Sequence, residues 1–395
     1  MDYKLLFEVS VYRKDRISSD KVDKENYIST ENMLPNRGGV EIATTVASAK
    51  TFPAYKKGDI LLSNIRPYFK KIWYADKEGG CSNDVLVVKG NKTVDNKFLY
   101  YVLSDNNFFN YSTVTSKGTK MPRGNKNAIM KYWVPDLDLP TQRKIADILS
   151  SYDELIKANN ERIELLEQTA QELYKEWFVR FRFPGYENVQ FEDGIPEGWE
   201  IKRIVDLFDI TSSKRVYLAD YVDAGIPFYR SKEIIQLSQG QAITEPLYIS
   251  NAAYENFKSK YGAPEKNDIL ITSVGTIGVS YLVDGHEFYF KDGNLTWIKS
   301  GSNKVLSLFL FQWLNSQSGK QQLLQSTIGT SQSALTIENL KKIKLLVPTK
   351  ALIEDYYQKA HVMLEQKSAL QMNNRNLAVQ RDMLLPRLMS GKLEV

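Results

Sequence analysis

The sequence predicts an α+β fold in which two tandem domains of mixed sheet and helix are separated by two long helices. Two stretches carry apolar residues spaced alternately three and four apart, which is the pattern of a coiled-coil seam. Each stretch follows a Val-Pro exit from a predicted strand, at Val134-Pro135 and at Val347-Pro348. The segments before these exits share landmarks in the same order, with a period of about 210 residues. We expect the two helices of such a duplicated chain to contact each other, with near two-fold symmetry between the two halves.

The first block, residues 1–140, is predicted to be a mixed domain of short strands and a few helices. Ile60 to Ser63 and Val85 to Val88 are β-branched or apolar runs bounded by turn residues, which is typical of strands. Asn96 to Leu103 has the clearest helical pattern in this block. The sequence therefore favours segregated strands and helices rather than a regular alternation of the two.

A spacer helix is predicted within residues 141–184, beginning at Thr141 and ending near Phe181. A helix of about forty residues is on the order of 60 Å long, which is more than a compact domain needs. Its apolar seam must therefore contact another helix. The interface positions predicted on it are Tyr152, Ile156, Asn159, Ile163 and Leu166.

A connector, residues 185–196, leads to the second block, residues 197–346, which repeats the first in diverged form. Lys57-Gly58-Asp59-Ile60 corresponds to Lys266-Asn267-Asp268-Ile269, in each case a polar turn before an apolar strand. The Gly-Thr segment Ser116 to Lys120 corresponds to Thr327 to Ser331. Leu306 to Ser316 is the clearest helical pattern of the second block.

The second spacer helix is predicted within residues 347–395, with a weaker seam that several polar residues interrupt. Aligning Asn159-Asn160 with Asn373-Asn374 matches the centres of the two helices without a gap. A polar Asn at a core position lowers stability but fixes the register of a helix pair. The interface positions predicted on this helix are Asn373, Asn374, Leu377 and Leu384.

Composition argues against catalytic chemistry in this chain. The single cysteine, Cys81, and the two isolated histidines, His286 and His361, cannot assemble a zinc site or a histidine-based triad. Gly275-Thr276-Ile277-Gly278 lacks the lysine of a phosphate-binding loop. We therefore predict no catalytic residues, no metal site and no bound cofactor, and expect the protein not to be an enzyme.

Charge and aromatic residues make nucleic acid a candidate ligand. Residues 1–140 contain 22 Lys and Arg against 16 Asp and Glu, and the cations cluster beside aromatic residues and in turn-like segments. Such loops can follow phosphates and reach base edges. A solvent-exposed charged face with no ligand is the alternative for each cluster. The residues predicted to lie near DNA are Arg66, Lys70, Lys117, Lys120, Arg123, Arg230, Lys232 and Gln332.

Several of these motifs together resemble a known family. Ile226 to Ser231, Asn267 to Leu270, Gly275 to Gly278 and Leu346-Val347-Pro348 occur in the order found in the specificity subunit of type I restriction-modification systems. Pro140-Thr141-Gln142-Arg143-Lys144-Ile145, at the start of the first spacer helix, is similar to the same family and is quite specific to it. The resemblance spans essentially the full chain, and the first block departs from the pattern most.

The resemblance implies two target-recognition domains, residues 1–140 and 197–346, that read the two halves of a bipartite double-stranded DNA target. It also implies two methyltransferase subunits as partners, and restriction subunits bound through them. S-adenosylmethionine, ATP and magnesium would then be bound only by those partner subunits. The resemblance further implies that the two long helices form an antiparallel coiled coil with pseudo-two-fold symmetry, which holds the recognition domains apart. The outer faces of the helices would contact the partners.

The remaining expectations concern location and rival functions. No run approaches 18 apolar residues, and the N-terminus lacks the pattern of a signal peptide, so we expect a cytoplasmic protein without a membrane partner. A non-catalytic coiled-coil scaffold without sequence-specific DNA binding is the main alternative. A fused restriction and methylation enzyme would need a further catalytic region, and the two repeats fill this sequence.

Overall fold

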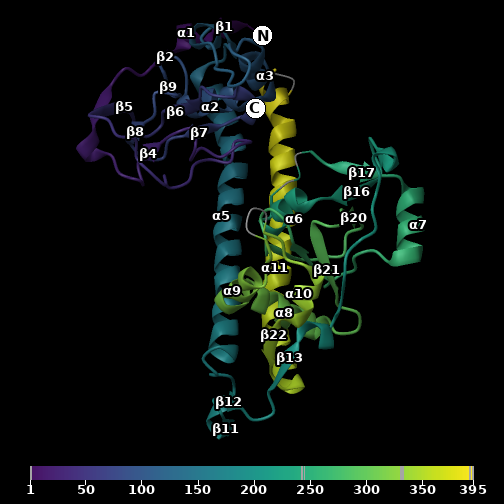
Figure 1. Ribbon diagram of the computed structural model, residues 1–395. Helices are drawn as coiled ribbons and strands as arrows, with labels where there is room; N and C mark the ends of the chain where they lie inside the picture. Colours follow the sequence, from purple (N-terminus) through teal and green to yellow (C-terminus); the bar gives the residue numbers. More distant parts are fainter. Residues whose placement is uncertain (1, 242, 244, 330–332, 391–392, 394–395) are drawn as a thin grey trace. The chain divides into compact units, whose positions relative to one another are not determined.

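The chain divides into two compact units, each of which combines one block with parts of both long helices (Figure 1). The structure is a computed structural model and describes residues 2–241, 243, 245–329, 333–390 and 393. Unit 1 contains Met1–Ile156 and Leu377–Val395, and unit 2 contains Lys157–Asn376. The predicted α+β class with two long helices is confirmed.

Two four-stranded sheets and a two-stranded ribbon form the first block. The first sheet is antiparallel, with the order β2 (Ser10–Tyr12), β9 (Val85–Gly90), β6 (Ile60–Ser63), β7 (Ile72–Tyr74). The second has the order β3 (Arg16–Ser18), β5 (Thr51–Tyr55), β8 (Gly79–Cys81), β4 (Tyr27–Ile28), with β4 and β8 parallel. The ribbon pairs β1 (Tyr3–Leu5) with β10 (Trp133–Pro135). The helices are α1 (Leu6–Val9), α2 (Asn96–Ser104), α3 (Asn106–Val114) and α4 (Lys126–Ile129), with the 3-10 turns η1 (Ser19–Lys21) and η2 (Pro67–Phe69).

The second block repeats this plan with one change in strand order. Its antiparallel sheet is β14 (Asp209–Thr211), β21 (Leu295–Lys299), β18 (Ile269–Thr272), β19 (Ser280–Leu282), and its ribbon is β13 (Glu200–Arg203) with β22 (Lys344–Val347). The other sheet is β15 (Tyr221–Val222), β17 (Leu247–Ile249), β16 (Ile226–Tyr229), β20 (Tyr289–Phe290), with β16 and β20 parallel. Here β17 pairs with β16, whereas its counterpart β5 pairs with β8. The helices are α6 (Ser231–Ser238), α7 (Asn251–Tyr261), α8 (Lys304–Asn315), α9 (Gln317–Gln325) and α10 (Ile337–Lys342), with η4 (Ile204–Asp206) and η5 (Leu218–Asp220).

The repeated turn before the central strand of each block is stabilised by a buried aspartate. Asp59 accepts hydrogen bonds from Lys56 N at 2.7 Å and from the Arg13 guanidinium, and Asp268 accepts one from Glu265 N at 2.9 Å. The residue before each aspartate, Gly58 or Asn267, has a positive φ. The repeated motif therefore marks the same left-handed turn in both blocks, and in each block the aspartate that follows stabilises the turn.

Each unit has its own hydrophobic core. In unit 1 the helices α2 and α3 cover the β6 sheet, with Phe98 and Phe108 fully buried. In unit 2, α8 shares a core with α11, and Phe309 of α8 joins an aromatic cluster with Phe178 and Tyr356. The ring centroids of Phe178 and Tyr356 are 4.8 Å apart. Residues of the long helices are therefore part of the domain cores as well as spacers.

The two long helices, α5 (Leu139–Phe178) and α11 (Lys350–Met389), pack antiparallel within each unit. In unit 2, Asn159 Nδ2 donates to Asn374 Oδ1 at 2.8 Å, and Asn374 Nδ2 donates to Asn160 Oδ1 at 2.8 Å. Glu167 and Lys367 form an ion pair further along the same interface. In unit 1, Leu149 of α5 and Leu385 and Leu388 of α11 belong to one core cluster.

The helix positions predicted from the seam differ in exposure. Asn159 is buried, and the remaining predicted positions on α5 are half-buried, as are Asn374, Leu377 and Leu384 on α11. Asn373 is exposed, and it is Asn374 that bridges to the other helix. Which asparagine of the Asn-Asn pair faces the other helix depends on the rotation of the helix about its axis. Two adjacent identical residues give no indication of that rotation in the sequence.

The effect of removing the hydrogen bond between Asn159 and Asn374 should depend on whether one asparagine or both are replaced. Asn159→Ala should lower the free energy of unfolding by about 1–3 kcal/mol, because Asn374 Oδ1 loses its buried donor. The double variant Asn159→Leu/Asn374→Leu should be as stable as the native protein or more so, with a less well defined register. Denaturant unfolding checks both, with the exposed Asn373→Ala as the control outside the bridge. A double variant less stable than the single one would contradict this reading.

The start of α5 is tied to the first block by a buried glutamine. Gln142 Nε2 donates to Leu137 O at 2.7 Å, and Gln142 Oε1 accepts from Asp95 N at 2.7 Å. Asp138 Oδ1 accepts from Thr141 N at 3.0 Å. Hydrogen bonds from Thr141 lower the pKa of the Asp138 carboxyl. The Pro140-Thr141-Gln142 motif thus sets where the helix begins and how it joins the domain.

Several element boundaries differ from the sequence-based expectation. Helix α5 begins at Leu139, before Thr141, because Pro140 is well suited to a first helical turn. It ends at Phe178, so residues 179–184 of the predicted spacer are not helical, and Phe181 has a left-handed φ of 56°. The connector 185–196 contains the 3-10 turn η3 (Tyr186–Asn188) and a small hairpin of β11 (Phe191–Glu192) and β12 (Ile195–Pro196). Among the described helices, none combines the length and apolar character needed to cross a membrane.

Candidate DNA interface

Two loops of the first block are held together by backbone pairing. The segments 64–71, after β6, and 117–124, before α4, are called the first loop pair. Ile65 and Lys117 both form β-bridges with Arg123. Arg66 N donates to Pro122 O at 2.8 Å, and Gly124 N donates to Asn64 O at 2.9 Å. Five of the predicted DNA-contacting residues therefore lie in this loop pair: Arg66, Lys70, Lys117, Lys120 and Arg123.

The second block builds the same arrangement, the second loop pair, from residues 273–278 and the described parts of 328–335. Val274 and Ile328 both form β-bridges with Ala334, and Leu335 N donates to Ser273 O at 2.9 Å. Asn64 N donates to Asp84 O in the first block, and Ser273 N donates to Asn294 O in the second. The backbone of the loop pair is thus conserved between the two repeats.

The side chains that the two loop pairs present are different. By these bridges Ile65 corresponds to Val274, Lys117 to Ile328, and Arg123 to Ala334. The first loop pair is cationic and carries exposed rings and apolar side chains at Tyr68, Phe69 and Met121. The corresponding positions of the second loop pair are small or apolar. Two copies of one scaffold therefore display different chemistry at the same place.

Backbone strain is concentrated in the first loop pair and the segment that supports it. Arg66 (φ 49°), Lys70 (φ 54°), Asn36 (φ 55°) and Arg37 (φ 62°) are left-handed non-glycine residues. Asn36 N donates to Phe69 O at 2.8 Å, and Arg37 N donates to Lys70 O at 2.9 Å. A left-handed residue with a side chain costs on the order of 1–2 kcal/mol. Such strain tends to be retained at sites that bind ligands.

Two polar atoms of the first loop pair are buried without a hydrogen-bonding partner among the described residues. They are Asn64 Oδ1 and Arg66 Nε. The guanidinium carbon of Arg66 lies 6.0 Å from the centroid of the Phe69 ring. Groups of this kind can be satisfied by a ligand that offers both an acceptor and a donor.

The exposed part of the first loop pair has the composition expected for nucleic-acid binding. Lys117, Lys120 and Arg123 are exposed, and Arg123 is 3.3 Å from the Asp84 carboxylate. Exposed cations can neutralise phosphates, and exposed rings such as Tyr68 can stack on bases. This surface could therefore contact both the backbone and the bases of a nucleic acid.

Lys70 points toward the protein rather than outward. Its Nζ donates to Asn106 Oδ1 on α3 at 2.8 Å, and Arg37 Nη2 donates to the same oxygen at 2.8 Å. Burial, together with the nearby Arg37 charge, lowers the pKa of Lys70 below its ordinary value. The structure thus gives Lys70 a role in fixing the loop to α3, and a DNA contact by Lys70 stays a prediction.

The cations predicted in the second block are paired with carboxylates. Arg230 donates through Nε and Nη2 to Glu233, which is fully buried, with the shorter contact at 2.6 Å. The hydrogen bond to Glu233 raises the pKa of Arg230. Lys232 Nζ is 2.9 Å from Glu245. Arg230 therefore stabilises the start of α6. The last residue predicted in this block, Gln332, lies outside the described residues.

The sequence analysis missed the special conformation at Arg66 and its buried neighbour Asn64. The only sequence signal was the alignment of the two repeats, which places Arg66 opposite Gly275, a left-handed glycine with φ 78°. Recognising that Gly275 marks a left-handed position would have marked Arg66 as strained. The burial of Asn64 Oδ1 depends on tertiary packing and has no sequence signal.

Gly124 is required by the packing of Asn64. A Cβ atom at Gly124 would lie 2.8 Å from Asn64 Oδ1 and 3.1 Å from Ile129 Cδ1. Gly124→Ala should therefore lower the free energy of unfolding by about 1–3 kcal/mol, as overpacking does elsewhere. Thermal unfolding checks this. The double variant Gly124→Ala/Asn64→Ala removes the main clash and should recover most of the loss, and failure to recover it would contradict the proposed packing.

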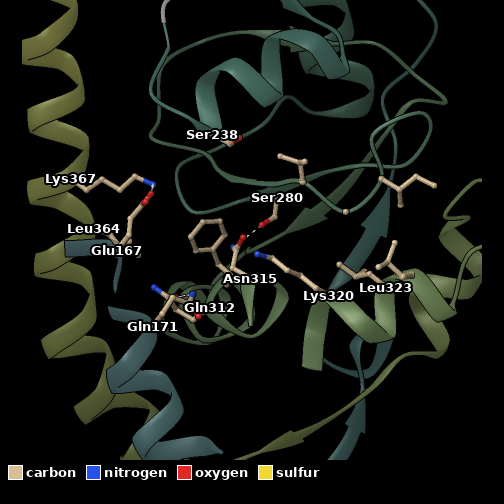
Figure 2. A pocket seen from close by; sticks show the side chains of 15 residues that line it. Glu167, Gln171, Ser238, Ser280, Gln312, Asn315, Lys320, Leu323, Leu364 and Lys367 are labelled. Atoms are coloured by element: carbon tan, nitrogen blue, oxygen red, sulfur yellow. Dashed lines mark hydrogen bonds and ion pairs between the residues drawn. The ribbon is translucent and has the colours of Figure 1, made fainter. Parts of the chain in front are cut away.

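A cavity of about 470 Å³ in unit 2 is lined by side chains of α5, α8, α9 and α11 (Figure 2). Six of its polar side chains are bonded in pairs: Glu167 with Lys367, Gln171 with Gln312, and Asn315 Nδ2 with Ser280 Oγ at 2.8 Å. Figure 2 shows the first two pairs side by side, joining the helices across the cavity wall. The described residues contain no group of three or more His, Cys, Asp or Glu placed to hold a metal ion.

Comparisons with known proteins agree with these features. The family model described as type I restriction modification DNA specificity domain matches this chain twice, at residues 6–168 and 196–363. The chain is 26% identical over 386 residues to the type I restriction enzyme MjaIX specificity subunit of Methanocaldococcus jannaschii, covering 94% of this chain and 85% of that relative. It is 23% identical to the type I restriction enzyme HindI specificity subunit of Haemophilus influenzae, covering 93% and 94%.

The fold is also found among solved structures. The crystal structure of a type I restriction-modification system S subunit from M. genitalium superposes with a TM-score of 0.58 at 16% identity, covering 98% of this chain and 95% of that chain. The matched family is a DNA specificity domain and not a catalytic one. The protein therefore belongs to the family of type I restriction modification DNA specificity domains, of which it carries two copies.

Proposed function

We propose that this chain is the DNA sequence-specificity subunit of a type I restriction-modification complex and reads a bipartite target with one recognition domain per half-site. The observation that carries the proposal is the repeated loop pair. Ile65, Lys117 and Arg123 in one block and Val274, Ile328 and Ala334 in the other form the same bridges. Two equivalent surfaces on one chain suit a target with two separated parts, much as paired half-sites suit dimeric DNA-binding proteins.

The two half-sites should differ in sequence. The first loop pair is cationic and the second is small and apolar at corresponding positions, so the two cannot offer the same donors and acceptors to base edges. Because both domains are in one chain, the two recognition surfaces could diverge independently. We therefore propose an asymmetric target.

We propose two methyltransferase subunits as partners. Matched exposed apolar residues in the two blocks support this. Leu5 N donates to Glu8 as Arg203 N donates to Asp206, which aligns Tyr3 with Ile201 and Phe7 with Val205. All four of these aligned apolar side chains are exposed. Repetition of an apolar surface at equivalent positions suits two copies of one partner.

The long helices also offer surface to a partner. Apolar side chains that face solvent on both helices are Leu155, Leu165, Val362, Met372, Val379 and Met383. Polar residues would be expected at these positions if the helices were fully solvated. We propose that methyltransferase subunits cover these faces and that restriction subunits join through them.

We place S-adenosylmethionine, ATP and magnesium on those partner subunits, and the assembled complex in the cytoplasm with its DNA target. The chain itself would supply recognition and assembly. A coiled-coil scaffold without sequence-specific binding is not favoured, because that function would not explain why the chain carries two specificity domains.

A reconstitution experiment tests the proposal. Purified chain mixed with the methyltransferase encoded beside it should form a complex of fixed stoichiometry that binds one bipartite sequence selectively, as measured by light scattering and by selection from a random DNA library. Mutating Lys120 to alanine should weaken binding to all sequences by a similar factor and reduce its salt dependence, as loss of a phosphate contact does. A complex that binds all sequences equally would contradict the proposal.

A further inference from the structure

We infer that Arg66 reads a guanine in the half-site bound by the first block and is a residue that determines specificity there. The inference rests on the proposed function and adds a base and a residue to it. It depends on three observations about Arg66: its backbone conformation, its unpaired guanidinium and its counterpart in the other repeat.

The backbone at Arg66 is unfavourable for an arginine. Its φ and ψ of 49° and 66° are left-handed, and the next residue is Pro67, before which extended conformations are preferred. The conformation is locked, because Arg66 N donates to Pro122 O and Phe69 N donates to Arg66 O at 2.9 Å. The loop therefore keeps a geometry in which a glycine would be more stable.

The second repeat uses that glycine. Ile65 and Val274 occupy equivalent bridge positions, so Arg66 corresponds to Gly275, which is also left-handed. No heavy atom of the described residues lies within 4 Å of a Cβ built at Gly275. The fold thus has no steric need for a side chain at this position, and the arginine in the first repeat requires another reason.

The guanidinium of Arg66 makes no hydrogen bond and no ion pair to an acceptor among the described residues. The other four arginines of residues 1–140 all donate to protein acceptors: Arg13 to Asp59, Arg16 to Thr51, Arg37 to Ser104 and Asn106, and Arg123 to Asp84. Among the described residues Arg66 has no ion pair, and its Nε is buried without an acceptor. It also lies in the loop pair that carries the exposed cations.

Guanine fits this site better than a phosphate. The fork of N–H donors on an arginine matches the adjacent O6 and N7 acceptors of guanine in the major groove. An arginine fork also fits a phosphate, but the exposed Lys117 and Lys120 already offer cations for phosphates in this loop pair. The hydrogen-bonded, left-handed backbone fixes the point from which the Arg66 side chain extends, and such positioning is what base recognition requires.

The test compares Arg66→Gly and Arg66→Asn with the native chain, each assembled with the methyltransferase and selected against a random DNA library. Both substitutions tolerate a left-handed backbone, so both complexes should assemble, and the melting temperature of Arg66→Gly should equal or exceed the native value. The native complex should prefer guanine at one position of one half-site. In both variants that preference should fall roughly tenfold to a hundredfold, with every other position unchanged.

Lys120→Ala serves as the contrast, because it should weaken binding without altering any base preference. If the Arg66 variants retain every base preference, or lose affinity equally for all sequences as Lys120→Ala does, the inference is wrong while the proposed function stands. If the native complex itself selects no bipartite sequence, the proposed function fails and the inference fails with it.

Discussion

Replacing Asp59 with alanine should lower the free energy of unfolding of unit 1 by about 3–5 kcal/mol, because it leaves a buried arginine without its partner. Arg13 Nε lies 2.6 Å from Asp59 Oδ2, and its Nη2 lies 3.0 Å from Asp59 Oδ1. The side chains of Arg13 and Asp59 are 8% and 3% exposed. The hydrogen bond to Asp59 raises the pKa of Arg13. Arg13 stays charged when that bond is removed, because an arginine guanidinium is always charged in proteins.

The same arginine supplies the control. Asp15 also contacts Arg13, at 2.6 Å from Nη1, but its side chain is 61% exposed. Asp15→Ala should therefore cost under about 1 kcal/mol, as exposed ion pairs do. Denaturant unfolding followed by tryptophan fluorescence measures both variants. Equal losses for Asp59→Ala and Asp15→Ala would contradict the view that burial of the repeated turn stabilises each block.

Exchanging residues 1–140 for the corresponding block of another member of the family should replace one half of the recognised sequence and leave the other half unchanged. The loop pair of the second block is built within residues 197–346, with no residue from the first block in its bridges. Binding to the original target should fall by at least about a thousandfold, because specific contacts to one half-site are lost.

Selection of DNA from a random library by the chimeric complex measures the outcome. The reciprocal chimera, in which residues 197–346 are exchanged, should change only the opposite half-site. Melting temperatures near that of the native chain establish that both chimeras fold. A target that changes in both halves, or in neither, would contradict one recognition domain per half-site.

The sequence predicted the long helices and the duplication well, because these depend on local periodicity and on order along the chain. The alternation through Ile145 and Leu149 marked α5, and the matched Asp59 and Asp268 turns marked the repeat. It could not predict that β5 pairs with β8 while β17 pairs with β16, since strand pairing is decided by tertiary contacts. The helices α6 and α7 of the second block have no counterpart in the first block, so comparing the two repeats could not predict them.

Individual site residues were less predictable for a related reason. Arg230 and Lys70 have the charge expected of DNA-binding residues, yet in the folded structure Arg230 donates to Glu233 and Lys70 donates to Asn106. Glu233 follows Arg230 by three residues, which is the spacing of a helix-start ion pair, so this one had a sequence signal. Arg66 was predicted because it is a cation beside aromatic residues in a turn-like segment, and its strained backbone became visible only with the fold.

The measurement that tests the central claim most directly is mapping of DNA methylation in a host genome that carries the neighbouring methyltransferase gene, with and without the gene for this chain. The account predicts that methylation at one bipartite, asymmetric motif is present when the chain is expressed and absent when it is deleted. Methylation that persists at the same motif without the chain, with the methyltransferase expressed in both strains, would contradict its role in recognition.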